Sequence, residues 1–143
     1  TAPAPAPERS ARAEHQAPAG ATALVVDDEP DLLEVAATYL KEMGYRVLTA
    51  PNGPAALRTL AGGPPVDLLV TDVIMPGGMN GVKLSRKVRE RHPDIRVVFT
   101  SGFASQALAE RRSTRVDGPL VNKPFQRHEL AAALNLALNG VLA

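Results

Sequence analysis

The sequence predicts an α/β protein built on a doubly wound parallel sheet. Two observations lead to this prediction. Short apolar runs that suit buried strands alternate with amphipathic segments that suit helices. Each intervening segment is also long enough to cross over to a parallel neighbouring strand. A chain of 143 residues, 45% of them hydrophobic, fits a single domain of this kind.

The first 22 residues are predicted to be a linker. The segment TAPAPAPERSARAEHQAPAGAT alternates Ala and Pro before a mixed-charge run, and it has neither helical nor strand periodicity. Its prolines favour extended conformations that space domains apart. We expect residues 1–22 to be a disordered linker or a trimmed tail, and residues 23–143 to form the domain. Because the chain begins at Thr1, it is expected to come from a longer protein.

Five apolar runs predict the strands and five segments predict the helices. The clearest helix spans Pro30–Met43, because its apolar residues recur at intervals of three and four and Gly44 follows. The predicted strands are Ala23–Val26, Tyr45–Ala50, Val66–Thr71, Ile95–Thr100 and Leu120–Val121. The other predicted helices are Gly53–Ala61, Val82–Arg91, Ala104–Arg112 and Gln126–Leu138. Helices that connect parallel strands cover both faces of the sheet.

The composition argues against several classes of function. The chain has no cysteine, which excludes disulfides, thiolate metal sites and a cysteine nucleophile. A formal charge of +1 and 3% aromatic residues do not suit nucleic-acid binding. No apolar run approaches the ~18 residues of a membrane span. We therefore expect a cytoplasmic domain that contacts neither nucleic acid nor membrane.

Charged residues follow three of the predicted strands. The first strand runs into Asp27 and Asp28, the third into Asp72 and the fifth into Lys123. The carboxyl ends of parallel strands meet at one edge of a sheet, where ligands bind. Carboxylates this close repel one another unless a hard divalent cation neutralises them, and Mg²⁺ is usual where a phosphate also binds. The alternatives are that Asp28 or Glu29 caps the following helix and that Lys123 is solvated.

Four ordered motifs resemble the receiver domain of two-component response regulators. They are VVDDEP, TDVIMP with a glycine soon after, FTSG and NKPF. The resemblance covers the chain from Ala23 onward and implies a flavodoxin-like, CheY-like fold with strand order 2-1-3-4-5 and five helices. It also implies partners, either a histidine kinase or a histidine phosphotransfer domain. The domain would catalyse only its own phosphorylation and dephosphorylation, as a monomer or weak dimer.

The resemblance assigns roles to the acidic residues. Asp72 matches the phosphoacceptor, whose carboxylate attacks a phosphohistidine to form an aspartyl phosphate. Asp27 and Asp28 match the acidic residues that hold Mg²⁺, together with Asp72 itself. The main-chain carbonyl of Ile74 matches a further oxygen ligand of the metal. The expected cofactor is therefore Mg²⁺.

The resemblance also assigns the groups that contact the phosphoryl oxygens, and the chain departs from the family pattern nearby. Thr100 matches the inward-turning hydroxyl, and Lys123 matches the ammonium that neutralises charge. The Lys123-Pro124 bond is expected to be cis. Leu120 stands where the family commonly has Tyr or Phe. The stretch 77–80 is one residue longer than the common pattern.

A receiver domain of this kind would have to act through an effector outside these residues. Only five residues follow the last predicted helix, which is too few for an effector domain, and the Ala/Pro tail resembles the linker of hybrid kinases. We therefore expect the C-terminal receiver of a hybrid sensor histidine kinase. The alternative is a stand-alone regulator that signals by protein–protein interaction. A haloacid-dehalogenase-like phosphatase is disfavoured, because that family needs Asp-x-Asp where this chain has Asp27-Asp28-Glu29.

Overall fold

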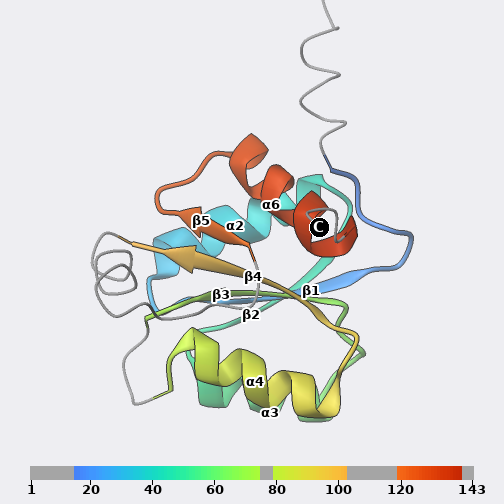
Figure 1. Cartoon of the computed structure of the whole chain (residues 1–143), viewed down its shortest axis with the longest axis vertical. Coiled ribbons are helices and arrows are strands. Elements are labelled where there is room, and N and C mark those ends of the chain that lie inside the picture. Colours follow the sequence, from blue (N-terminus) through green and yellow to red (C-terminus); the bar gives the residue numbers. More distant parts are fainter. Residues whose placement is uncertain (1–14, 75–78, 103–118, 140–143) are drawn as a thin grey trace, which may run out of the picture.

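Five parallel strands form one sheet in the order β2-β1-β3-β4-β5 (Figure 1). The computed structural model describes residues 15–74, 79–102 and 119–139. The strands are β1 (Thr22–Val26), β2 (Arg46–Ala50), β3 (Leu68–Asp72), β4 (Arg96–Ser101) and β5 (Leu120–Asn122). The predicted doubly wound sheet and its strand order 2-1-3-4-5 are confirmed.

Helices cover both faces of the sheet. The described residues contain α2 (Pro30–Glu42), α3 (Gly53–Gly62), α4 (Gly81–Arg91) and α6 (Arg127–Asn139). Figure 1 shows α2 and α6 on one face and α3 and α4 on the other. The described residues thus hold four helices where five were predicted. The remaining helix, predicted at 104–112, falls within 103–118, outside the described residues.

The central strand β1 shows why buried strands read as continuous apolar runs. Its alternate residues enter different layers, because successive side chains of a strand point to opposite faces. Val25 belongs to a cluster with Leu40 and Leu134 on the α2/α6 side, whereas Leu24 packs in a cluster with Val88 on the α3/α4 side. Both faces of the strand are covered, so no polar alternation remains in its sequence.

Asparagine caps set the start of two helices on the α3/α4 side. The Asn52 side chain accepts a hydrogen bond from the Ala55 amide at 2.8 Å, and the Asn80 side chain accepts one from the Lys83 amide at 2.8 Å. Each of these side chains satisfies a backbone amide that has no partner within its helix.

No helix among the described residues is long and apolar enough to cross a membrane.

The described part of the predicted linker packs against the domain. The His15 side chain is buried, with Nε2 2.7 Å from the Tyr45 hydroxyl and Nδ1 2.9 Å from Asn135 Oδ1. The Ala17 amide donates to the Met43 carbonyl at 2.9 Å. These contacts join the chain upstream of β1 to the connection between α2 and β2 and to α6. We therefore propose that the folded domain begins near His15, upstream of the boundary predicted at residue 23.

The His15→Ala variant is expected to lower the free energy of unfolding by about 1–3 kcal/mol, because Tyr45 and Asn135 lose a hydrogen-bond partner. Burial also lowers the pKa of His15 below its ordinary value. The unfolded chain then binds more protons near pH 6, so stability should fall as the pH drops below about 6.5. Urea titrations at pH 7.5 and 5.5 measure both effects.

The matched control for His15 is His128→Ala, which changes an exposed histidine. It is expected to stay within about 0.5 kcal/mol of the parent chain. Equal losses in the two variants, or an unchanged pH dependence without His15, would contradict the assignment of this segment to the domain.

Candidate functional site

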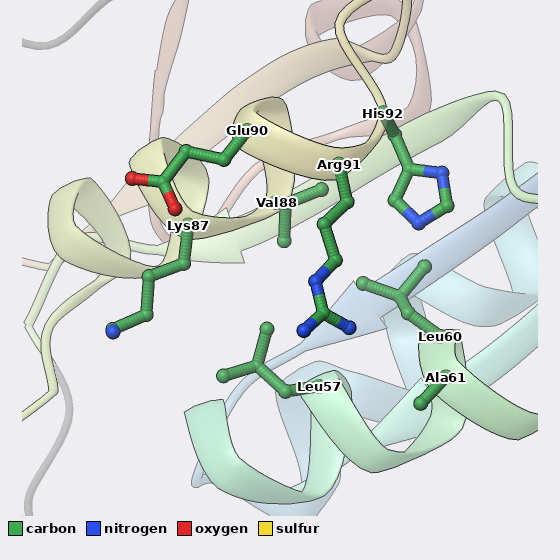
Figure 2. Close-up of a pocket in the computed structure, with 8 residues that line it drawn as sticks. All are labelled: Leu57, Leu60, Ala61, Lys87, Val88, Glu90, Arg91 and His92. Carbon is green, nitrogen blue, oxygen red and sulfur yellow. The ribbon is translucent and has the colours of Figure 1, made fainter.

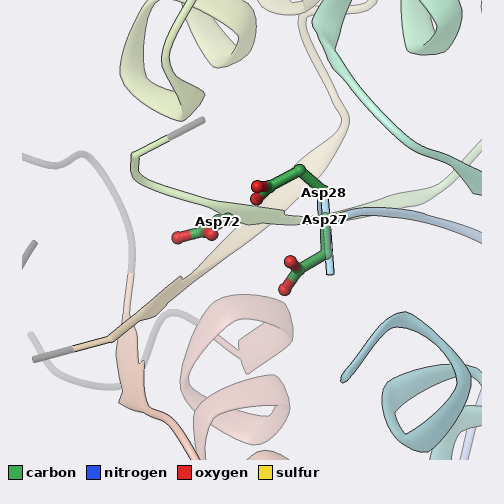
Figure 3. A group of neighbouring side chains, drawn as sticks. All are labelled: Asp27, Asp28 and Asp72. Atoms are coloured by element: carbon green, nitrogen blue, oxygen red, sulfur yellow. The ribbon is translucent and has the colours of Figure 1, made fainter. Parts of the chain in front are cut away.

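Three carboxylates meet at the carboxyl ends of β1 and β3. Asp27 and Asp28 follow β1 directly, and Asp72 is the last residue of β3, its neighbour in the sheet. One oxygen from each residue lies within 4.8 Å of the others, and Figure 3 shows the three side chains grouped around a common space. Asp27 and Asp72 are buried and Asp28 is exposed. The structure thus brings together the three acidic residues that the sequence predicted as a group.

Lys123 lies among these carboxylates. Its Nζ donates to Asp72 Oδ2 at 2.9 Å, to Asp27 Oδ2 at 3.2 Å and to Glu29 Oε1 at 3.3 Å. The side chains of Lys123, Asp27 and Asp72 are each only 6% exposed. The alternative of a solvated lysine is therefore wrong. The Lys123-Pro124 peptide bond is cis, as predicted.

Backbone amides orient the two buried carboxylates. The Ile74 amide donates to Asp72 Oδ1 at 3.3 Å, and the Glu29 amide donates to Asp27 Oδ1 at 2.9 Å. In each residue the other oxygen faces Lys123. Glu29 occupies the N-cap position of α2 and makes no side-chain cap. Capping therefore does not account for the acidic residues after β1.

The site carries an excess of negative charge. Burial raises the pKa of both Asp27 and Asp72, and the hydrogen bonds and charge of Lys123 offset only part of that rise. Burial lowers the pKa of Lys123, but its hydrogen bond to Asp72 and the charges of Asp72 and Asp27 outweigh this, so the pKa is raised. The ammonium of Lys123 thus lies beside four carboxylates, those of Asp27, Asp28, Glu29 and Asp72. An all-oxygen donor set with surplus negative charge suits a hard divalent cation.

Thr100 contributes a hydroxyl that has no hydrogen-bond partner among the described residues. It pairs with Asp72 in the register of β3 and β4, so the two side chains are on the same face of the sheet. Its Oγ1 is buried and makes no hydrogen bond within the described part of the chain. Buried hydroxyls normally have a partner, so this one is available to a bound group.

The role of the Ile74 carbonyl as a metal ligand stays a prediction.

Gly81 is a residue of the site that the sequence did not single out. A Cβ at this position would overlap the carbonyl oxygen of Asp72, and the Gly81 amide donates to the Val73 carbonyl at 2.8 Å. The start of α4 thus lies directly against the backbone of Asp72. The glycine after TDVIMP was noticed only as part of a motif, since a sequence does not show how closely two backbones approach.

The Gly81→Ala variant is expected to lose about 1–3 kcal/mol of folding free energy, because the new methyl group meets backbone that cannot move aside cheaply. Gly62→Ala is the matched control, since a Cβ at Gly62 meets nothing within 4 Å. It lies in α3 and is expected to be neutral or stabilising. Denaturant titration of both variants tests this, and equal stabilities would contradict it.

A family model described as the response regulator receiver domain matches residues 23–135. The curated relatives include sensor kinase CckA of Brucella abortus, 34% identical over 134 residues, which are 93% of this chain and 14% of the kinase. They also include the receiver protein CpdR of the same organism, 34% identical over 107 residues, which are 75% of this chain and 88% of that protein. The chain thus spans a small part of the first relative and most of the second.

Solved receiver structures share the fold. A receiver protein from Sinorhizobium medicae is 30% identical with a TM-score of 0.71, covering 84% of this chain and 95% of that one. A receiver domain from Clostridium thermocellum is 27% identical, with the same TM-score and the same coverage. The chemotaxis protein CheY4 of Vibrio cholerae, 24% identical with a TM-score of 0.68, covers 83% of this chain and 99% of that one. This last likeness bears on the fold alone.

Proposed function

The chain belongs to the response regulator receiver family of two-component systems, and from this we propose that Asp72 accepts a phosphoryl group in the presence of Mg²⁺. The observation that carries the proposal is the position of Asp72. Its carboxylate is buried, is bonded to Lys123 at 2.9 Å and lies within 4.8 Å of the carboxylates of Asp27 and Asp28. Phosphoryl transfer needs a positioned nucleophile and neutralised charge. The hydrogen bonds to Asp72 support its role as the nucleophile, and Lys123 together with a bound Mg²⁺ would neutralise the charge.

The proposed reaction transfers the phosphoryl group from a phosphohistidine. An Asp72 oxygen attacks the phosphorus, the phosphorus–nitrogen bond breaks, and the imidazole keeps the electron pair and takes a proton from water. Lys123 and the hydroxyl of Thr100 donate hydrogen bonds to the phosphoryl oxygens. Asp27, Asp28 and Asp72 would hold the metal, together with the Ile74 carbonyl. Mg²⁺, when bound, offsets the charge of the carboxylates and of the phosphoryl oxygens.

A small acyl phosphate tests this function directly. Acetyl phosphate and Mg²⁺ are added to the whole chain, and intact mass spectrometry follows the product. We expect the mass of a single phosphoryl group to be added, and the adduct to be labile to hydroxylamine, as acyl phosphates are. No adduct, or several adducts on one chain, would contradict the proposal.

We propose that this receiver is part of a hybrid sensor histidine kinase in the cytoplasm and takes its phosphoryl group from a histidine kinase or phosphotransfer domain. The match to a sensor kinase supports this, since it covers 93% of the chain. A stand-alone regulator is the second candidate, supported by the match that spans 88% of CpdR. The full reading frame distinguishes them, because a hybrid requires a kinase core upstream of Thr1.

Phosphorylation is not expected to cause dimerisation through β5, because Leu120 has no flat ring to move between two positions. Leu120 lies at the start of β5 and is 41% exposed. Sedimentation and amide exchange with and without beryllofluoride, a phosphoryl mimic, measure the effect. Dimerisation together with strong protection of β5 would contradict it. The larger changes expected at 75–81 and 101–105 fall mostly outside the described residues.

A further inference from the structure

The α3/α4 face of the domain is strongly basic. Helix α4 carries five Lys or Arg residues and a single acidic residue, Glu90, while α3 carries Arg58 and no acidic residue. The helices on the other face, α2 and α6, together carry two Lys or Arg and four Asp or Glu residues. The chain as a whole has a formal charge of only +1. Among the four described helices, the positive charges are therefore concentrated on α3 and α4 and the negative charges on α2 and α6.

A groove of about 210 Å³ lies between α3 and α4 (Figure 2). Its apolar lining is Leu57, which is half-buried, the exposed Ala61, and Leu60 and Val88, which are almost wholly buried. Lys87, Glu90, Arg91 and His92 complete the lining. Figure 2 shows the Arg91 guanidinium reaching from α4 toward the leucines of α3. The groove thus offers an apolar contact surface beside two cationic side chains, those of Lys87 and Arg91.

The two cationic side chains of the groove are free to meet an acidic partner. Lys87 and Arg91 are exposed, and neither forms an ion pair with another described residue. Glu90 also lines the groove, so the lining has two Lys or Arg side chains and one carboxylate. This excess of positive charge attracts and orients an acidic surface.

We propose that the α3/α4 groove docks an acidic amphipathic helix of a partner protein. Its apolar side chain would contact Leu57 and Ala61, the apolar lining residues that reach the surface, and its carboxylates would face Lys87 and Arg91. A nucleic acid would use the cations and leave the apolar lining unused. A flat membrane surface would not reach into a groove between two helices.

The groove is separate from the carboxylate site. Its residues lie between the middle and the C-terminal ends of α3 and α4, whereas Asp72 lies beside Gly81 at the N-terminus of α4. A partner could therefore occupy the groove while Asp72 is phosphorylated. The inference does not depend on the proposed function, because it uses none of the residues that would carry the phosphoryl chemistry.

A synthetic peptide tests this inference with the whole chain. The probe is a fluorescein-labelled helical peptide with two leucines on one face and glutamates beside them, at physiological ionic strength. We expect anisotropy to report binding and NMR shifts to map it to Leu57 and Ala61. The double variant Lys87→Glu with Arg91→Glu is expected to bind at least about tenfold more weakly. Replacing the peptide leucines by serine is expected to weaken binding about tenfold as well.

The control is Lys41→Glu, which makes the same type of charge change on an exposed residue of α2. It is expected to bind the peptide as the parent chain does. The inference is overturned if the peptide does not bind, if Lys41→Glu weakens binding per charge as much as the double variant, or if the serine peptide binds equally well. It is also overturned if duplex DNA or phosphatidylglycerol vesicles displace the peptide from the groove.

Discussion

The Asp72→Asn variant is expected to take up no phosphoryl group from acetyl phosphate. The amide that replaces the carboxylate is not a nucleophile. Among the described carboxylates that bond to Lys123, Asp72 lies closest to its Nζ, at 2.9 Å, and it is the last residue of β3. The loss is expected to be complete, because Asp27 and Asp28 are assigned to the metal. Intact mass spectrometry of the treated chain measures the adduct.

The fold is expected to survive this substitution. Burial raises the pKa of Asp72, so its ionised form at neutral pH costs folding free energy, and asparagine removes that cost. The metal-free melting temperature should not fall. Asp94→Asn is the control, since Asp94 is exposed and outside the carboxylate cluster. Normal labelling of Asp72→Asn, or equal loss in Asp94→Asn, would show that another residue accepts the group.

Removal of divalent cations is expected to abolish phosphorylation of the parent chain. Without a cation, the phosphoryl group would approach three carboxylates and a single ammonium. Addition of Mg²⁺ at one hundred times its Kd is expected to stabilise the fold by about 2.7 kcal/mol. Thermal melts and labelling with and without a chelator measure both effects. The Asp28→Asn variant should bind Mg²⁺ more weakly.

The affinity for Mg²⁺ is expected to fall as the pH is lowered. Burial raises the pKa of Asp27 and of Asp72, so protons compete with the metal at a higher pH than for ordinary carboxylates. Titrations of Mg²⁺ between pH 7.5 and 5 follow the loss. Labelling that persists in the chelator, or an affinity independent of pH, would mean that the three carboxylates do not form the metal site.

Much of the fold and site could be predicted from local patterns. Buried parallel strands read as apolar runs, so the residues at their carboxyl ends stood out, and Asp27, Asp28 and Asp72 do lie together. Lys123 is different, because a lysine after a two-residue apolar run is commonly solvated. Its place in the cluster depends on β5 pairing with β4, a contact that the motif indicated and periodicity did not.

Other features depend on contacts that have no local pattern. His15 lies in a Pro-rich stretch without periodicity, and its partners are 30 and 120 residues away in the sequence. Gly81 matters because two backbones approach each other closely. The basic face of α3 and α4 was hidden by the net charge, because a chain-wide sum of +1 averages opposite charges on different helices.

Mapping the phosphorylated residue tests the central claim most directly. Borohydride reduces an aspartyl phosphate to homoserine, which peptide mass spectrometry locates in the sequence. After treatment of the whole chain with acetyl phosphate and Mg²⁺, we predict homoserine at position 72 and at no other position. Homoserine at position 27 or 28, or a phosphoryl group retained on a histidine or serine, would contradict the assignment of Asp72 as the phosphoacceptor.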